Sequence, residues 1–120
     1  MNPKHKFFLN ETVKFAVKNI KLNSLPRKIV IVNDVKFAEK MQSFGVYDVG
    51  TDQIHVYAGS RHIADVCRTL FHELVHHKQR EQGKPADGSD GSSVENEAHA
   101  LAGVLMRKFR YEYPEIYLEK

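Results

Sequence analysis

Two histidines with a glutamate after the first stand at the spacing H-E-x-x-H in the stretch TLFHELVHHKQREQG. On a helix that turns by about 100° per residue, His72 and His76 lie about 40° apart on one face. Two imidazoles one turn apart can bind one tetrahedral Zn²⁺ without distorting the backbone. Glu73 lies about 100° round from His72, so it is free to act as a general base on the attacking water. The spacing therefore predicts a zinc hydrolase centre.

The helix that carries this motif has an apolar side and a polar stripe. The apolar side comprises Ile63, Ala64, Cys67, Leu70, Phe71, Leu74 and Val75, and the polar stripe comprises Asp65, Thr69, His72, His76 and Gln79. A histidine of the core would lie among the leucines, so His72 and His76 are expected to face a cleft. His77 lies about 140° from His72 and is expected to be an exposed surface residue.

A third ligand has to come from elsewhere in the chain, because a catalytic zinc site usually has three protein ligands. The metzincin extension H-E-x-x-H-x-x-G-x-x-H is excluded, since Gln79 and Gln82 occupy the glycine and histidine positions. The later segment VENEAHALAGVLMRKF offers Glu95, Glu97 and His99 on one expected helix. Glu95 and Glu97 flank the apolar stripe of that helix on opposite sides. Helical periodicity therefore does not choose between them.

The elements before the motif follow from the spacing of apolar residues. A helix is predicted over residues 10–21, with Asn10 as its N-cap. The β-branched run KIVIVND predicts a buried strand over residues 28–34. Residues 35–44 fit either a short helix or a turn. Two strand-like runs around a Gly-Thr-Asp turn then predict a hairpin over residues 45–57.

The motif and the candidate third ligands belong to two further helices. Ser60 is the expected N-cap of a long helix that runs to about Glu81. Residues 82–94 are rich in Gly, Ser, Asp and Pro, which predicts a loop that acts as a lid over the cleft. Ser93 is the expected N-cap of a final helix over residues 94–110. The order of elements predicts a small α+β domain.

Length and composition limit the class of protein. A chain of 120 residues with 42% hydrophobic and 28% charged residues is typical of one soluble globular domain, here residues 1–120. The one cysteine, Cys67, excludes a disulfide framework and an all-cysteine zinc site. Neither a signal peptide nor a run of ~18 apolar residues is present, so we expect a cytoplasmic protein that is not bound to a membrane.

The charge of the chain argues against nucleic acid as a partner. The net charge is +3, and the basic residues are spread along the sequence except for a cluster at Arg107, Lys108 and Arg110. A nucleic-acid site requires a broader basic face than this. The cluster is better explained as the solvated end of a helix.

The segment HELVHHKQ, followed by ENEAHALAGVLM, resembles the compact zinc peptidases of the ImmA/IrrE type and, more broadly, the minimal gluzincins. The resemblance covers residues 45–109. In that pattern the glutamate directly before the alanine is the third ligand, which implies Glu97 here. Ala98 and Ala102 are then the small residues that let the two helices approach closely. The SprT-like peptidases use histidine as third ligand, so His99 remains an alternative candidate for that ligand.

The resemblance implies a zincin-like domain with a short, mostly antiparallel sheet. Its hairpin would pack on the active-site helix, and a C-terminal helix would carry the last ligand. It implies a zinc metalloendopeptidase in which His72, His76 and Glu97 bind Zn²⁺ and Glu73 is the catalytic base. The hairpin at 45–57 would hold an extended protein or peptide substrate by β-augmentation.

The alternative is a non-catalytic protein, stabilised by zinc, that keeps the peptidase fold for a structural or interaction role. The proteins of the ImmA/IrrE type often carry a further DNA-binding or sensor region, for which 120 residues leave no room. A compact product of a phage or mobile element fits that size. If the protein is encoded by a phage, association with a virion is an alternative to a cytoplasmic location. Glu73 argues against this alternative, because a purely structural site has no use for a base.

Overall fold

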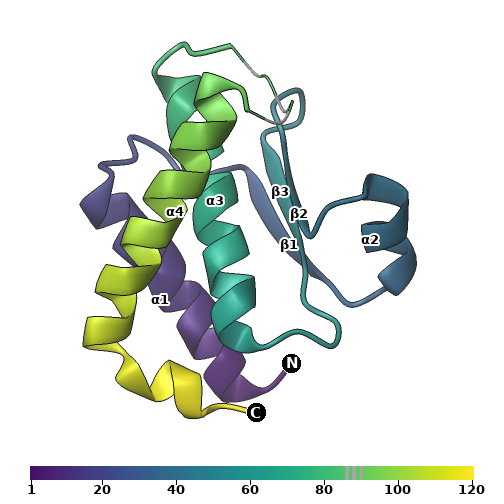
Figure 1. Ribbon diagram of the computed structural model, residues 1–120, viewed down its shortest axis with the longest axis vertical. Helices are drawn as coiled ribbons and strands as arrows, with labels where there is room; N and C mark the ends of the chain where they lie inside the picture. Colours follow the sequence, from purple (N-terminus) through teal and green to yellow (C-terminus); the bar gives the residue numbers. More distant parts are fainter. Residues whose placement is uncertain (86, 88, 90) are drawn as a thin grey trace.

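The computed structural model describes residues 1–85, 87, 89 and 91–120, and Figure 1 shows how its helices and strands are arranged. In chain order the elements are α1 (Pro3–Asn19), β1 (Lys28–Val32), α2 (Val35–Met41), β2 (Gly45–Asp48), β3 (Gln53–Tyr57), α3 (Ile63–Glu81), α4 (Ser93–Glu112) and the 3₁₀-helix η1 (Pro114–Leu118). The predicted α+β class is confirmed. Within these described ranges, no helix is long and apolar enough to cross a membrane.

The three strands form one mixed sheet in the order β1-β3-β2. The hairpin of β2 and β3 is antiparallel, as expected, and Tyr47 pairs with Ile54. Strand β1 instead runs parallel to β3, with Ile29 opposite Ile54. The expectation of a mostly antiparallel sheet is therefore wrong in this detail, because the chain crosses from β1 through α2 and β2 before it returns as β3. Strand β2 lies at one edge of the sheet.

Helix α3 is the central element of the fold. It lies between the pair of helices α1 and α4 and the sheet (Figure 1). Phe71 on α3 packs edge-on against Phe15 of α1 and Phe109 of α4, with ring centroids 6.1 and 5.6 Å away. Each buried phenylalanine contributes roughly 2–3 kcal/mol from burial alone. This packing fixes the position of α4 across α3, and therefore of any ligand that α4 carries.

The first helix starts earlier than its apolar spacing predicts. Helix α1 begins at Pro3, because the side chain of Asn2 accepts a hydrogen bond from the backbone N–H of Lys4. Proline is favoured in the first helical turn, where its missing N–H has no partner to lose. Asn10, the expected N-cap, lies inside the helix.

The N-caps of the other two long helices also lie two residues and one residue from the expected positions. The N-cap of α3 is His62, whose Nδ1 accepts from the backbone N–H of Ala64 at 3.0 Å. Ser60, the expected cap, has a positive φ of 55° and belongs to the preceding turn. Ser92 rather than Ser93 is the N-cap of α4, and its hydroxyl accepts from the backbone N–H of Glu95.

The last turn of α3 fixes the linker between α1 and β1. The carboxylate of Glu81 accepts hydrogen bonds from the backbone N–H groups of Asn23 and Ser24, at 3.1 and 2.9 Å, and from the Ser24 hydroxyl at 3.0 Å. Burial opposes ionisation of this carboxyl. The hydrogen bonds from Asn23 and Ser24 outweigh burial and lower the pKa of Glu81 below its ordinary value.

Replacement Glu81→Gln is expected to lower the free energy of unfolding at neutral pH by about 1–2 kcal/mol, because hydrogen bonds to a charged group are lost. A carboxyl whose pKa is lowered by folding contributes its stability above the ordinary value of 4.5 and loses it as the pH falls through the folded-state pKa. Urea unfolding of both chains across pH 2–7 measures the difference. The difference in free energy of unfolding should shrink below about pH 4.5. The control Glu39→Gln, on the exposed side of α2, should alter the free energy of unfolding little at any pH. A difference for Glu81→Gln that stays constant with pH contradicts this account.

The two ends of the chain lie together. Figure 1 shows the N- and C-termini at the same end of the molecule, away from the connection between α3 and α4. Glu119 lies 3.9 Å from the ammonium of Lys4 and 4.0 Å from the ring of His5. The Nε2 atom of His62 also lies 2.6 Å from the backbone oxygen of Glu119. The last residues are thus fastened to the starts of both α1 and α3.

Candidate metal centre

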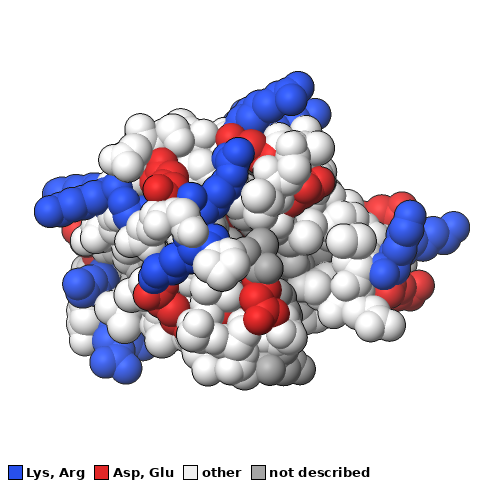
Figure 2. Space-filling view, turned by 90° about the horizontal axis from the view of Figure 1, so that it is seen from above, with Lys and Arg blue, Asp and Glu red and all other residues white. Residues whose placement is uncertain are grey.

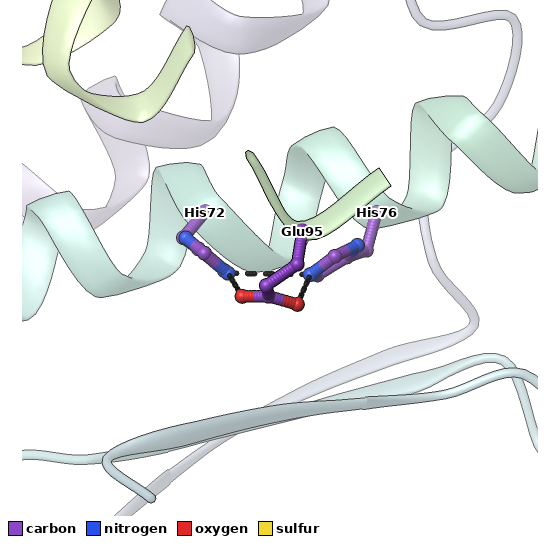
Figure 3. Close-up of side chains that lie close together, drawn as sticks. All are labelled: His72, His76 and Glu95. Atoms are coloured by element: carbon purple, nitrogen blue, oxygen red, sulfur yellow. Dashed lines mark hydrogen bonds and ion pairs between the residues drawn. The ribbon is translucent and has the colours of Figure 1, made fainter. Parts of the chain in front are cut away.

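Three side chains from two helices converge in front of the sheet. His72 and His76 extend from α3, and the carboxylate of Glu95, in the first turn of α4, lies between their rings (Figure 3). Oε1 of Glu95 is 2.6 Å from Nε2 of His72, and Oε2 is 3.1 Å from Nε2 of His76. The two Nε2 atoms are 3.2 Å apart. Among the described residues, this is the one group of three or more such side chains whose ligand atoms lie close enough to share a metal ion.

The hydrogen bonds behind His76 leave its Nε2 atom free to bind a metal. The amide nitrogen of Gln79 donates to the backbone oxygen of Val94 and to Glu97, both at 2.8 Å, which fixes the orientation of the amide. Its oxygen therefore faces Nδ1 of His76, at 2.8 Å, and can only accept. Nδ1 carries the proton, and the lone pair of Nε2 points at Glu95. This arrangement is typical of metal-binding histidines.

The donor set fits a divalent metal of the zinc type. Two imidazole nitrogens and one carboxylate are the ligands of many catalytic zinc sites, which leave a fourth position open. Burial lowers the pKa of His72 below its ordinary value, although the carboxylate of Glu95 opposes that shift. A neutral imidazole is the form that binds a metal.

The structure places Glu95, and not Glu97, beside the histidines. Glu97 lies on the other side of α4, where it accepts from Gln79 and pairs with the ammonium of Lys84 at 3.0 Å. Residues two positions apart on a helix point about 200° apart, so the two glutamates of an E-x-E pattern cannot both reach the pair of histidines. Glu97 instead contacts the centre indirectly, through Gln79 and His76.

The remaining candidate, His99, stands one turn after Glu95 on α4. The centroid of its exposed ring lies 6.4 Å from that of His72, outside the group of converging ligand atoms. Gln79 was singled out in the sequence only as a member of the polar stripe. Its position three residues after His76, on the same side of the helix, is the signal that indicates a supporting role.

Glu73 is buried at the bottom of the centre, with 6% of its surface exposed. Strand β2 presses directly against it: a Cβ atom on Gly45 would stand 2.6 Å from Thr69 and 3.0 Å from Oε2 of Glu73. Burial, with the negative charge of Glu95, raises the pKa of Glu73 to about 8, and a hydrogen bond from the backbone of Tyr47 opposes the rise. A divalent cation at the centre would also oppose it, because it favours the charged carboxylate.

His77 is fully buried, with 1% of its surface exposed, so the expectation of a surface residue is wrong. Its Nε2 atom donates to the backbone oxygen of Ser24 at 2.9 Å, and Nδ1 lies 3.1 Å from the hydroxyl of Tyr47 and 3.3 Å from Asp52. The helical pattern shows one apolar side, but α3 is covered by the sheet on a second side. His77 faces that second side and finds polar partners there.

The hydroxyl of Tyr47 lines the cleft but is already engaged. It donates to Oδ1 of Asp52 at 2.7 Å, and Arg80 contacts the same hydroxyl at 3.3 Å. Burial and the hydrogen bond to Asp52 raise the pKa of Tyr47 to about 12. Tyr47 therefore fixes β2 against α3, and the hairpin turn with it.

A cleft of about 510 Å³ opens in front of the centre. Strand β2 forms one wall, α3 the floor, and the first turn of α4 the opposite wall. The predicted lid, residues 82–94, includes residues 86, 88 and 90, which lie outside the described residues. Of its described residues, Lys84, Pro85, Asp87 and Val94 line the cleft. Figure 2 shows acidic and basic side chains interspersed on the described part of the face seen from above.

Comparison of the chain with protein-family models, with curated proteins and with solved structures gives no match. The similarity to zinc peptidases of the ImmA/IrrE type therefore stays a resemblance carried by two short motifs. The centre itself combines two imidazole nitrogens, a carboxylate and the buried carboxyl of Glu73 at the cleft.

Proposed function

We propose that this protein is a zinc-dependent peptidase of the gluzincin kind, in which His72, His76 and Glu95 hold Zn²⁺. The observation that carries the proposal is the convergence of two imidazole nitrogens and a carboxylate on one point, next to the buried carboxyl of Glu73. When bound, Zn²⁺ supplies a Lewis acid that activates water and polarises a peptide carbonyl.

Glu73 has the position required of a general acid–base. It follows His72 directly on α3, lines the cleft, and is kept in place by Gly45 and the backbone of Tyr47. Its carboxylate accepts a proton from the attacking water and then donates it to the leaving amine. Burying a carboxyl without a salt bridge reduces stability. A chain that used zinc only as a structural staple would gain nothing from this arrangement.

The cleft favours an extended polypeptide as substrate. Among the residues that the structure describes, strand β2, Gly45–Asp48, pairs with β3 alone, and its residues Gly45, Val46 and Tyr47 line the cleft. The free edge of a strand presents unpaired N–H and C=O groups, to which an extended peptide can add as a further strand. A protein or peptide bound in this way would pass directly over the three ligands.

Zinc is expected to bind at about one ion per chain and to be required for hydrolysis of an unfolded protein. Metal analysis of the purified protein, and cleavage assays before and after chelation and with zinc restored, test this directly. Zinc at 100 times its dissociation constant should stabilise the chain by about 2.7 kcal/mol, seen as a higher midpoint of thermal unfolding. Zinc binding without cleavage of any of a broad set of peptides would support the structural role instead. Failure to bind zinc would overturn the whole proposal.

A further inference from the structure

We infer that a second, basic groove between α3 and α4 holds an acidic segment of the polypeptide substrate. The groove has a volume of about 450 Å³, and its charged residues are Arg68 from α3 and Arg107 and Arg110 from α4. His99 and Tyr117 also line it. The inference rests on the proposed peptidase function, because it places part of the substrate there.

The three arginines of this basic groove are free of carboxylate partners. No aspartate or glutamate lines the groove, and within the described part of the chain none of the three arginines forms an ion pair. The cations beside the metal centre differ in this respect, since Arg80 pairs with Asp52 and Lys84 pairs with Glu97. Positive charge without a partner is therefore concentrated in the basic groove rather than at the cleft.

Arg68 is exposed, and one end of its guanidinium lies close to the backbone of α4. Its Nη2 atom would stand 3.3 Å from a Cβ atom placed on Gly103, so the absence of a side chain there lets the guanidinium approach the backbone of α4. The planar guanidinium leaves its other N–H groups accessible to a carboxylate, which it can bind through two parallel hydrogen bonds.

The basic groove adjoins the metal centre. His99 is part of its lining, and the centroid of its ring lies 6.4 Å from that of the metal-binding residue His72. One imidazole therefore separates the two sites. A polypeptide whose scissile bond lies over the metal centre can extend past His99 and place side chains a few residues away beside Arg68.

Carboxylates of a polypeptide fit this groove better than the phosphates of a nucleic acid. The positive surface is narrow, because Asp65 stands one turn before Arg68 on α3, and Glu112 and Glu115 follow Arg110. A nucleic acid requires a broad basic face along its backbone. A short run of acidic side chains needs only the length of the groove.

Binding of a fluorescent peptide pair to the zinc-loaded Glu73→Gln chain tests the inference without cleavage. One peptide carries three consecutive glutamates, and the other has glutamines in their place. We expect the acidic peptide to bind about ten-fold more tightly at low salt, since each exposed charge pair contributes a few-fold. The triple variant Arg68→Gln/Arg107→Gln/Arg110→Gln should abolish the preference. The matched control Lys18→Gln/Lys36→Gln/Lys40→Gln removes the same charge from exposed positions on α1 and α2 and should keep it.

Equal affinity for the two peptides would overturn the inference, as would a preference that survives in the triple arginine variant. Tighter binding of single-stranded DNA of equal charge, lost in the same variant, would assign the groove to nucleic acid and also overturn it. Failure of the peptidase proposal would appear differently: the acidic peptide would bind through the arginines, but the wild-type chain would cleave nothing. The groove would then stand as a site for acidic polypeptides without hydrolysis.

Discussion

A chain with Glu73→Gln is expected to bind zinc like the wild type and to hydrolyse peptides about 10²–10⁴-fold more slowly, the usual contribution of a general acid–base. The amide has the shape of the carboxyl, and its oxygen can accept the same hydrogen bond from the backbone of Tyr47. It cannot take a proton from water. Initial rates of cleavage and zinc content, measured on the same samples, separate catalysis from metal binding.

The matched control for this experiment is Glu39→Gln on the exposed side of α2, which makes the same chemical change at a residue that does not line the cleft. It should leave both the rate and the zinc content unchanged. Cleavage by Glu73→Gln at the wild-type rate would exclude Glu73 as the base. Loss of zinc from Glu73→Gln would mean that its carboxylate holds the metal, which contradicts the arrangement of ligands described above.

The second large effect concerns the two glutamates of α4. Glu95→Gln removes a ligand and is expected to lower zinc affinity by more than the ~10–100-fold that is typical of losing an outer hydrogen-bond partner. Glu97→Gln changes only the group that orients Gln79, and its amide oxygen can still accept from that side chain. Its effect should therefore fall at or below the lower end of that range.

Competition with a coloured zinc chelator measures both affinities under the same conditions. The pair is well matched, because the two residues stand two positions apart on one helix and undergo the same substitution. If Glu97→Gln lost zinc while Glu95→Gln kept it, the third ligand would be the residue implied by the family pattern. If both kept it, the third ligand would lie elsewhere, and His99→Ala would be the next variant to test.

The choice between Glu95 and Glu97 illustrates where sequence reasoning stops. The spacing of His72 and His76 is a local property of one helix, and it placed both rings on one face correctly. The side of α4 that meets α3 is instead set by the packing of residues such as Phe109 on Phe71 and Phe15. That packing depends on three helices at once, and no periodicity within α4 reveals it.

The prediction that His77 is exposed was wrong for a related reason. A helical pattern identifies a side by its apolar residues, and histidine does not count among them. The polar residues that receive the ring of His77 come from the linker after α1 and from the hairpin, Ser24 and Asp52 among them. A buried polar residue is stabilised by such distant partners, which only the tertiary structure brings together.

The predicted starts of the helices were inexact because several residues near each start are suitable N-caps. Asn2 and Asn10 are both suitable N-caps, and so are the adjacent serines Ser92 and Ser93. In each case the apolar spacing favoured the residue closer to the first apolar position of the predicted helix. The structure uses an earlier residue in both helices: in α1 an exposed, polar first turn precedes the buried part, and in α4 the hydroxyl of Ser92 accepts from the backbone N–H of Glu95.

Both chain ends lie at the end of the molecule opposite the α3–α4 connection. This position allows the chain to be joined to another protein, or inserted into one. A second protein joined to either end would start at the end of the molecule opposite the α3–α4 connection (Figure 1), whose residues Lys84, Pro85 and Asp87 line the cleft. The distance that an inserted copy must bridge is short, since Glu119 already contacts the beginning of α1. The two ends are thus close enough for residues 1–120 to be inserted into a loop of another protein.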